Sequence, residues 1–127
     1  MPDVVVISGH PHPGSSTLQL ALAVGKRFAA SRGHPRFVTV DVAKLGAALL
    51  SPADDATGRA LSKVRDATLL IVATPTCQGT FSGALKMLLD HLPANALAGV
   101  LAVPAVRKLT ERGLLWAAGE MEAQLRP

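Results

Sequence analysis

The chain has 127 residues and is expected to form one domain, residues 1–127, around a single hydrophobic core. Apolar residues make up 49% of the sequence but aromatic residues only 3%, so Val, Leu, Ile and Ala must build that core, as is typical of parallel strands covered by helices. Its formal charge of +4 is spread over scattered Lys and Arg, which argues against a nucleic-acid-binding face. The absence of a long apolar run argues against a membrane span, and a single cysteine excludes an internal disulfide.

The first predicted elements are a strand at residues 4–7 and the helix that follows it. The strand is apolar at every position, which indicates burial on both faces. Residues 8–14 are rich in Gly and Pro and predict a loop, after which the hydroxyl residues 15–17 can cap the helix. Gly33 stands where that helix is expected to end.

The remaining elements alternate between strand and helix. Strands are predicted at residues 37–40, 68–73 and 100–106, the last interrupted by Pro104, and helices at residues 57–66, 83–92 and 109–125. This alternation predicts a mostly parallel sheet with right-handed crossovers. Ligands of such sheets bind beyond the carboxyl ends of the strands, near the point where strand order reverses, so the loops after the first and third strands are the candidate site.

The loop after the first strand is a candidate phosphate site. It joins a buried strand to a helix through Gly9 and Gly14, and Ser15, Ser16 and Thr17 add hydroxyl donors to the main-chain N–H groups of the helix start. The loop matches neither G-x-x-x-x-G-K-[ST] nor G-x-G-x-x-G, which argues against an ATPase and an ordinary Rossmann dehydrogenase. The competing interpretation is that the serines only cap the helix and the prolines only shape the turn.

His10 and His12 form an H-x-H pair in the same loop. Such a pair can bind a metal ion, and Asp90 and His91 could add ligands, but the spacing does not bring three or four ligands together. We therefore predict no metal site and interpret the two histidines as polar loop residues, one of which could donate to a phosphate.

The second candidate region is the loop at residues 74–83. Its small residues and two glycines would let the main chain approach a flat ligand closely, although an ordinary strand-to-helix loop has the same composition. Cys77 could act as a nucleophile or redox thiol near a helix start. No His or second Cys is identifiable as its partner, so a small packed or ligand-lining side chain is the favoured interpretation.

At these two loops the sequence resembles the NADPH-dependent FMN reductase family, and especially the reductases that feed two-component alkanesulfonate monooxygenases. The similar stretches are residues 70–75 (LIVATP), 81–86 (FSGALK), 88–90 (LLD), 92–93 (LP), 96–97 (AL) and Gly99. The first loop fits the family pattern G-S-x-R-x-x-S-x-[ST] at Gly9, Ser15 and Thr17. The resemblance covers residues 4–104.

The resemblance implies an α/β fold with a flavodoxin-like, doubly wound parallel sheet, and an oxidoreductase that reduces FMN with NADPH (or NADH). It implies no catalytic side chain, because the chemistry belongs to the cofactors. The hydroxyl residues 15–17 would hold the FMN phosphate, residues 75–79 would lie along the isoalloxazine ring, and Ser82 and Gly83 would open the helix that supports this loop. The cofactor-binding residues expected on this basis are Gly9, His10, His12, Ser15, Ser16, Thr17, Pro75, Thr76, Cys77, Gln78, Gly79, Ser82 and Gly83.

The chain also departs from the family pattern, mostly on the ring side of the expected site. Cys77 stands where close relatives have Tyr, and Arg107 follows the fourth strand in place of a Thr-Gly-Gly-like loop. His10 and His12 replace a Ser and an Arg. We expect four strands, with the fifth strand of the family missing. An FMN-dependent quinone or azo reductase, and a non-catalytic flavodoxin-like flavin-binding or interaction module, stay open as alternatives.

The resemblance also implies partners for the chain, and the sequence itself indicates a location. Flavin and a nicotinamide nucleotide would be the small-molecule ligands, a flavin-dependent monooxygenase could receive the reduced flavin, and the chain would form a homodimer or homotetramer. Neither nucleic acid nor a membrane is expected as a partner. With one cysteine and no basic segment ahead of its first apolar run, the chain is expected to be cytoplasmic.

Overall fold

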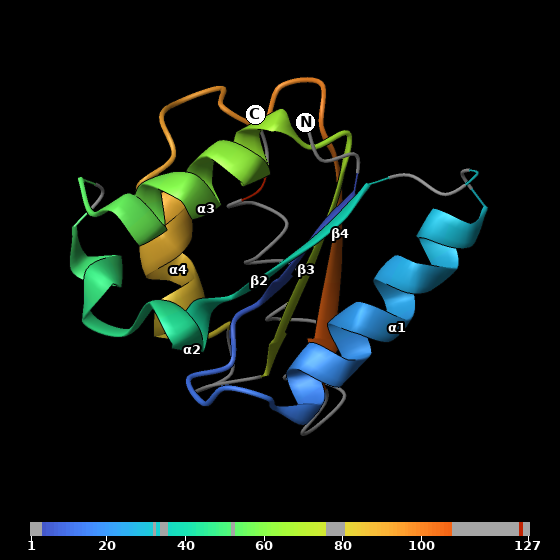
Figure 1. Ribbon diagram of the computed structural model, residues 1–127, viewed down its shortest axis with the longest axis horizontal. Coiled ribbons are helices and arrows are strands. Elements are labelled where there is room, and N and C mark those ends of the chain that lie inside the picture. The colour runs from blue at the N-terminus through green and yellow to red at the C-terminus, as the bar shows by residue number, and fades with distance from the viewer. Residues whose placement is uncertain are drawn as a thin grey trace.

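The computed structural model describes residues 4–31, 33, 36–51, 53–75, 81–107 and 125. Within them, four parallel strands form one sheet: β1 (Val4–Ser8), β2 (Phe37–Asp41), β3 (Leu69–Pro75) and β4 (Leu101–Arg107) (Figure 1). The strand order is β2-β1-β3-β4, so β1 pairs with β2 on one side and with β3 on the other. The predicted doubly wound parallel α/β class is confirmed.

The central strands β1 and β3 carry the middle of the core. Every residue of β1 and the first six residues of β3 are buried, as expected for runs that are apolar throughout and covered by helices on both faces. β4 lies at the edge of the described sheet and runs unbroken through Pro104, which is in register with Val72. A proline is tolerated there because an edge strand has a side on which it need not donate to a neighbour. The predicted interruption of this strand is therefore wrong.

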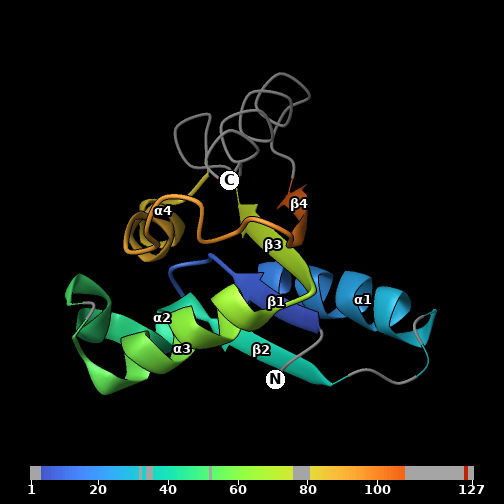
Figure 2. The same cartoon turned by 90° about the horizontal axis from the view of Figure 1, so that it is seen from above.

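Helices cover both faces of the sheet (Figure 2). α1 (Ser16–Ala30) packs on one face, where its Ala21 joins a buried cluster with Val6 and Ile71. The other face is covered by α2 (Val42–Leu45), the short 3-10 helix η1 (Gly46–Leu50), α3 (Asp55–Asp66) and α4 (Gly83–Asp90). None of the described helices combines the length and the apolar character that crossing a bilayer requires.

The structure corrects the sequence prediction mainly between the second and third strands. No element was expected over residues 42–50, which form α2 and η1, and α3 begins two residues earlier than predicted. Aspartates explain both differences: Asp41 accepts a hydrogen bond from the Ala43 N–H and Asp54 accepts one from the Ala56 N–H, so each caps a helix start. The helix predicted at residues 109–125 lies outside the described residues, except for Leu125, which is buried in the core.

Candidate functional site

The loops after β1 and β3 leave the sheet side by side. Strand order reverses between these two strands, and ligands of open parallel sheets bind in the crevice at such a point. The Gly9 N–H donates to the Ala73 carbonyl oxygen over 2.8 Å, so the first loop begins in contact with the end of β3. The two predicted candidate loops therefore start at one place in the fold.

The Ser82 hydroxyl fastens the start of α4 to the first loop. Its oxygen accepts from the Leu85 N–H at 3.1 Å, which caps the helix, and the hydroxyl donates to the Gly9 carbonyl oxygen. Gly9 makes this close approach possible, because a Cβ atom added there would lie 2.7 Å from the Cβ of Leu85. Ser82 and Gly9 thus hold α4 against the end of β1.

Thr74, near the end of β3, completes this connection. Its hydroxyl oxygen accepts from the Ser82 N–H at 3.0 Å, and the hydroxyl donates to the Pro75 carbonyl oxygen at 2.9 Å. The residue is fully buried. It was not among the predicted site residues, although a buried polar residue at the end of an apolar strand is the signal that could have identified it.

The N-terminus of α1 faces the first loop and is arranged to accept an anion. The side chain of Ser15 caps the helix by accepting from the Leu18 N–H at 3.2 Å, which confirms one of the three predicted caps. The Ser15 carbonyl accepts the first intrahelical bond, from the Gln19 N–H at 3.1 Å. This leaves the N–H groups of Ser16 and Thr17 outside the intrahelical pattern. The first turn contains no acidic side chain, so the helix dipole favours a negative charge there.

Two buried hydroxyls near the start of the first loop and the start of α1 have no hydrogen-bond partner within the described part of the chain. They are the hydroxyls of Ser8, the last residue of β1, and Thr17, in the first turn of α1. Both residues are 0% exposed. Leaving a buried hydroxyl unpaired costs about 1–3 kcal/mol, so such groups usually serve a ligand or an ordered water. A phosphate group, which offers several acceptor oxygens, fits these donors and the free N–H groups beside them.

Asp41, at the carboxyl end of β2, holds the other side of the first loop. Its carboxylate accepts from the Gly14 N–H and from the Ala43 N–H, each at 3.3 Å, and the residue is only 8% exposed. Gly14 adopts a φ of 65°, a conformation that favours glycine. Asp41 therefore shapes the loop and occupies the Gly14 N–H. Sequence reasoning placed it only as the end of a strand, because its loop partner lies 27 residues away.

The two histidines of the first loop interact with each other. The His12 N–H donates to Nδ1 of His10 at 3.0 Å, and the ring centroids are 5.5 Å apart. His12 is exposed and His10 half-buried. Across the described residues, no three His, Cys, Asp or Glu side chains gather as a metal site would need. The pair therefore acts in this structure as a local brace of the loop.

The second loop is described only at its ends. Pro75 is the last residue of β3 and is half-buried. Gly83 is the first residue of α4, and no atom lies within 4 Å of the position that a Cβ would take there. The predicted ring-side residues Thr76, Cys77, Gln78 and Gly79 lie outside the described residues. The predicted residues that the structure brings to the crevice are Gly9, Ser15, Ser16, Thr17, Pro75, Ser82 and Gly83, with His10 and His12 in the loop between them.

Comparisons of the sequence agree on one family. The model for NADPH-dependent FMN reductases matches residues 2–126. An FMN reductase (NADPH) of Pseudomonas aeruginosa is 34% identical over 128 residues, which cover 98% of this chain and 67% of that protein. An FMN reductase (NADPH) of Escherichia coli is 50% identical over 42 residues, which cover 33% of this chain and 22% of that protein. The alignments thus span from about a fifth to about two thirds of these relatives.

Solved structures with the same arrangement extend this finding. The apo form of an NADH:FMN oxidoreductase (EmoB) superimposes with a TM-score of 0.88 at 30% identity, covering 98% of this chain and 68% of that one. The azoreductase AzrA superimposes with a TM-score of 0.66 at 13% identity, covering 97% and 80% of the two chains, and this likeness concerns the fold alone.

Proposed function

Because this chain belongs to the NADPH-dependent FMN reductase family, we propose that it catalyses the reduction of FMN by NADPH. The family predicted from the two loops and the predicted flavodoxin-like fold are both confirmed. The observation that carries the proposal is the pair of buried, unpartnered hydroxyls of Ser8, at the end of β1, and Thr17, in the first turn of α1, together with the N–H groups of α1 outside the intrahelical pattern. Such a cradle suits the phosphate of a flavin mononucleotide.

In this proposal the chain binds and orients, and the two nucleotides supply the redox chemistry through their flavin and nicotinamide rings. Thr17 and Ser16 donate to the phosphate through their hydroxyl and N–H groups, and Ser15 positions them by capping α1. Gly9 lets the loop pass close to α4. His10 and His12 lie in the same loop, where one of them could donate to the phosphate.

We also assign the ring side of the site to the second loop, residues Pro75, Thr76, Cys77, Gln78 and Gly79. The resemblance carries this assignment, and its support in the structure is the position of the two ends of the loop. β3 ends at the crevice, and α4 is fastened to Gly9 through Ser82. A flavin whose phosphate lies at α1 would then extend along the ends of β1 and β3.

The wider role that we propose rests on the resemblance. Reduced FMN would leave the chain for a flavin-dependent monooxygenase, and the chain would act in the cytoplasm as a homodimer or homotetramer. The single cysteine suits a reducing compartment.

Steady-state oxidation of NADPH, followed by its absorbance while FMN is varied, tests the proposed activity. We expect a rate that saturates with FMN as substrate, with half-saturation on the order of 1 μM to 1 mM. A rate that needs only a trace of FMN but saturates with an added quinone would instead identify an FMN-dependent quinone reductase. FMN binding without NADPH oxidation would contradict an enzymatic role and identify a flavin-binding module.

A further inference from the structure

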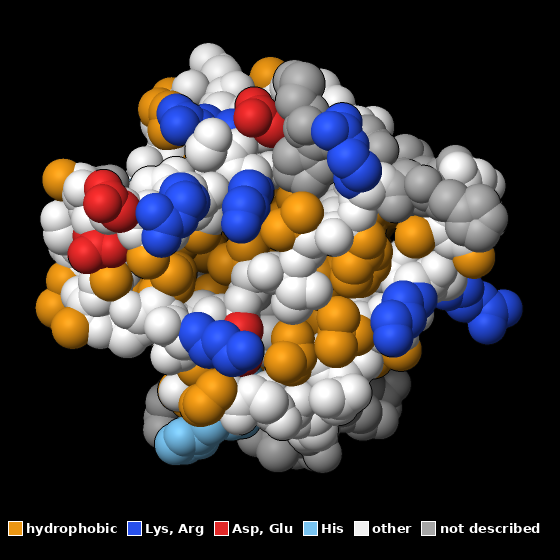
Figure 3. Space-filling model, in the orientation of Figure 1, with side chains coloured by type: hydrophobic (Ala, Val, Ile, Leu, Met, Phe, Trp, Pro, Cys, Tyr) orange, Lys and Arg blue, Asp and Glu red, His pale blue; other side chains and the backbone are white. Residues whose placement is uncertain are grey.

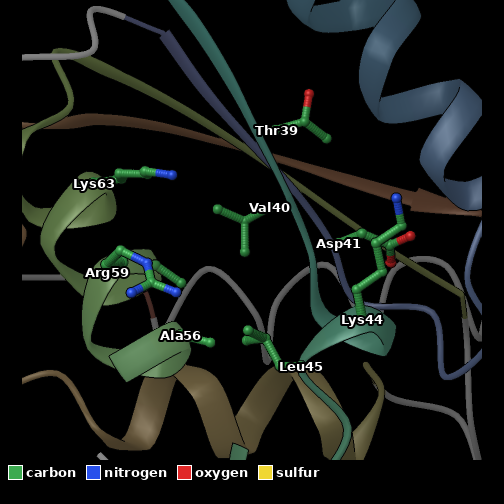
Figure 4. Close-up of a pocket in the computed structure, with 9 residues that line it drawn as sticks. Thr39, Val40, Asp41, Lys44, Leu45, Ala56, Arg59 and Lys63 are labelled. Atoms are coloured by element: carbon green, nitrogen blue, oxygen red, sulfur yellow. The ribbon is translucent and has the colours of Figure 1, made fainter. Parts of the chain in front are cut away.

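A cavity lies at the β2 edge of the sheet, between β2, α2 and α3 (Figure 4). Its volume is about 200 Å³. Val40, Leu45 and Ala56 give it an apolar lining, and Lys44, Arg59 and Lys63 bring positive charges to it from the two helices. Figure 3 shows this arrangement from outside, with Lys and Arg side chains over α3 and over α2 on either side of an apolar hollow.

Within the described residues, the cavity lining combines three cations with one carboxylate, that of Asp41. Within the described ranges, no carboxylate forms an ion pair with Lys44, Arg59 or Lys63, whereas Lys86 on α4 pairs with Asp90 at 2.9 Å. Arg59 and Lys63 are four residues apart and so share one face of α3, an arrangement that is mildly destabilising for like charges. Positive charges gathered around a cavity without partners suit an anionic ligand, and a guanidinium matches the geometry of a phosphate.

The volume and the lining of the cavity restrict the class of ligand that it can bind. Sites for whole drug-sized ligands usually have volumes of about 300–1,000 Å³, so a cavity of about 200 Å³ fits part of a nucleotide. The apolar lining suits a sugar or base, and the cationic rim suits a phosphate monoester. A phosphorylated nucleoside fragment combines both properties.

Asp41 connects this cavity to the first loop. The residue lines the cavity, and its carboxylate accepts from the N–H of Gly14 in the first loop. The same carboxylate accepts from the Ala43 N–H, so main-chain donors offset its negative charge. The cavity therefore adjoins the loop to which we assign the FMN phosphate.

We propose that this cavity binds the adenosine 2′-phosphate end of NADPH and makes the chain prefer NADPH to NADH. The inference rests on the proposed function, because NADPH must then be bound beside FMN. NADPH and NADH differ only in that phosphate, so a preference for NADPH requires cations that NADH leaves unused. Lys44, Arg59 and Lys63 are such cations.

Calorimetric titration of the FMN-free full chain with 2′,5′-ADP and with 5′-ADP tests the cavity without any turnover. We expect 2′,5′-ADP to bind roughly tenfold or more tightly than 5′-ADP, and Arg59→Ala or Lys63→Ala to remove most of that difference. Arg65→Ala is the matched control, because it removes one positive charge from the same exposed helix outside the cavity. Ala56→Leu, which fills the cavity and keeps its charges, should also weaken 2′,5′-ADP binding.

Equal affinity for the two ADP isomers, or equal losses in Arg59→Ala and Arg65→Ala, would overturn the inference, since either result indicates only diffuse attraction of anions. The same variants separate this inference from the proposed function. If Arg59→Ala and Lys63→Ala oxidised NADPH saturably and kept the preference for NADPH over NADH, the cavity would not be the 2′-phosphate site. The proposed reductase activity would still stand. Selective 2′,5′-ADP binding in a chain that binds no FMN would support the cavity and contradict the reductase.

Discussion

Thr17 and Thr57 show how the same side chain serves two purposes in this chain. Both are completely buried in the first turns of helices. The Thr57 hydroxyl donates to the Ala48 carbonyl oxygen at 2.7 Å, whereas the Thr17 hydroxyl has no partner among the described residues. We interpret the first as a structural bond and the second as a group held for a ligand.

Thr17→Val tests this interpretation by removing the hydroxyl and keeping the shape. FMN binding should weaken by about 1–3 kcal/mol, because a hydrogen bond to a charged group is lost. The free energy of unfolding without FMN should stay unchanged or rise slightly, because the variant no longer buries an unpaired hydroxyl. Flavin fluorescence and urea unfolding measure the two quantities.

Thr57→Val is the matched control. It should lower the free energy of unfolding by about 1–2 kcal/mol, because it leaves the Ala48 carbonyl oxygen without its donor, and should leave FMN affinity unchanged. If Thr17→Val destabilised the chain as much as Thr57→Val and bound FMN normally, Thr17 would be a structural residue.

Contacts between residues close together in the sequence could be predicted, whereas contacts over longer separations could not, even where both partners, such as Gly9 and Ser82, were predicted site residues. Ser15 caps α1 by accepting from the N–H of Leu18, three residues further along the chain, and the sequence alone shows that pattern. Asp41 reaches Gly14 across 27 positions, and Ser82 reaches Gly9 across 73. Such contacts depend on the sheet that brings the segments together, so local composition carries no sign of them.

At the scale of elements, the position of α4 depends on its close approach to β1. Gly9→Ala would place a Cβ 2.7 Å from the Cβ of Leu85, and neither atom can turn away because both are attached to the main chain. We expect a loss of about 1–3 kcal/mol in the free energy of unfolding, and weaker FMN binding as α4 and the first loop separate. Urea unfolding and an FMN titration measure both effects.

Gly83→Ala is the control for this prediction, because nothing lies within 4 Å of the added Cβ. An alanine near a helix start should leave the free energy of unfolding unchanged or raise it by up to about 1 kcal/mol. A stable Gly83→Ala variant that nonetheless lost FMN would assign Gly83 to the flavin contact. Equal destabilisation by the two substitutions would contradict the close packing at Gly9.

The type of an element could be predicted from the sequence where its apolar pattern was long, and could not be predicted where the element was short. β1, β3, α1 and α4 were all predicted within about two residues of their ends, because apolar runs and cap residues mark them. α2 and η1 contain four and five residues, too few to show a helical period. Their presence follows from the cap at Asp41 and from tertiary packing of Val42 and Leu49.

At the scale of the whole molecule, alternation of strand and helix predicted a parallel sheet, but the strand order and register came from the structure. The order β2-β1-β3-β4 decides which loops lie side by side, and it brings the loops after β1 and β3 together, as expected from the alternation of strand and helix. It also leaves the β2 edge beside α3, where the cationic cavity forms. That cavity could not be predicted, because its positive charges come from two separate helices, Lys44 from α2 and Arg59 and Lys63 from α3.

We propose above that FMN binds beyond the carboxyl ends of β1 and β3, with its phosphate at the start of α1. Titration of the full chain with FMN, followed by flavin fluorescence, tests it most directly. We expect saturable quenching at FMN concentrations on the order of micromolar, with weaker binding by Thr17→Val and unchanged binding by Thr57→Val. An unchanged flavin signal in a sample that circular dichroism shows to be folded would contradict the claim.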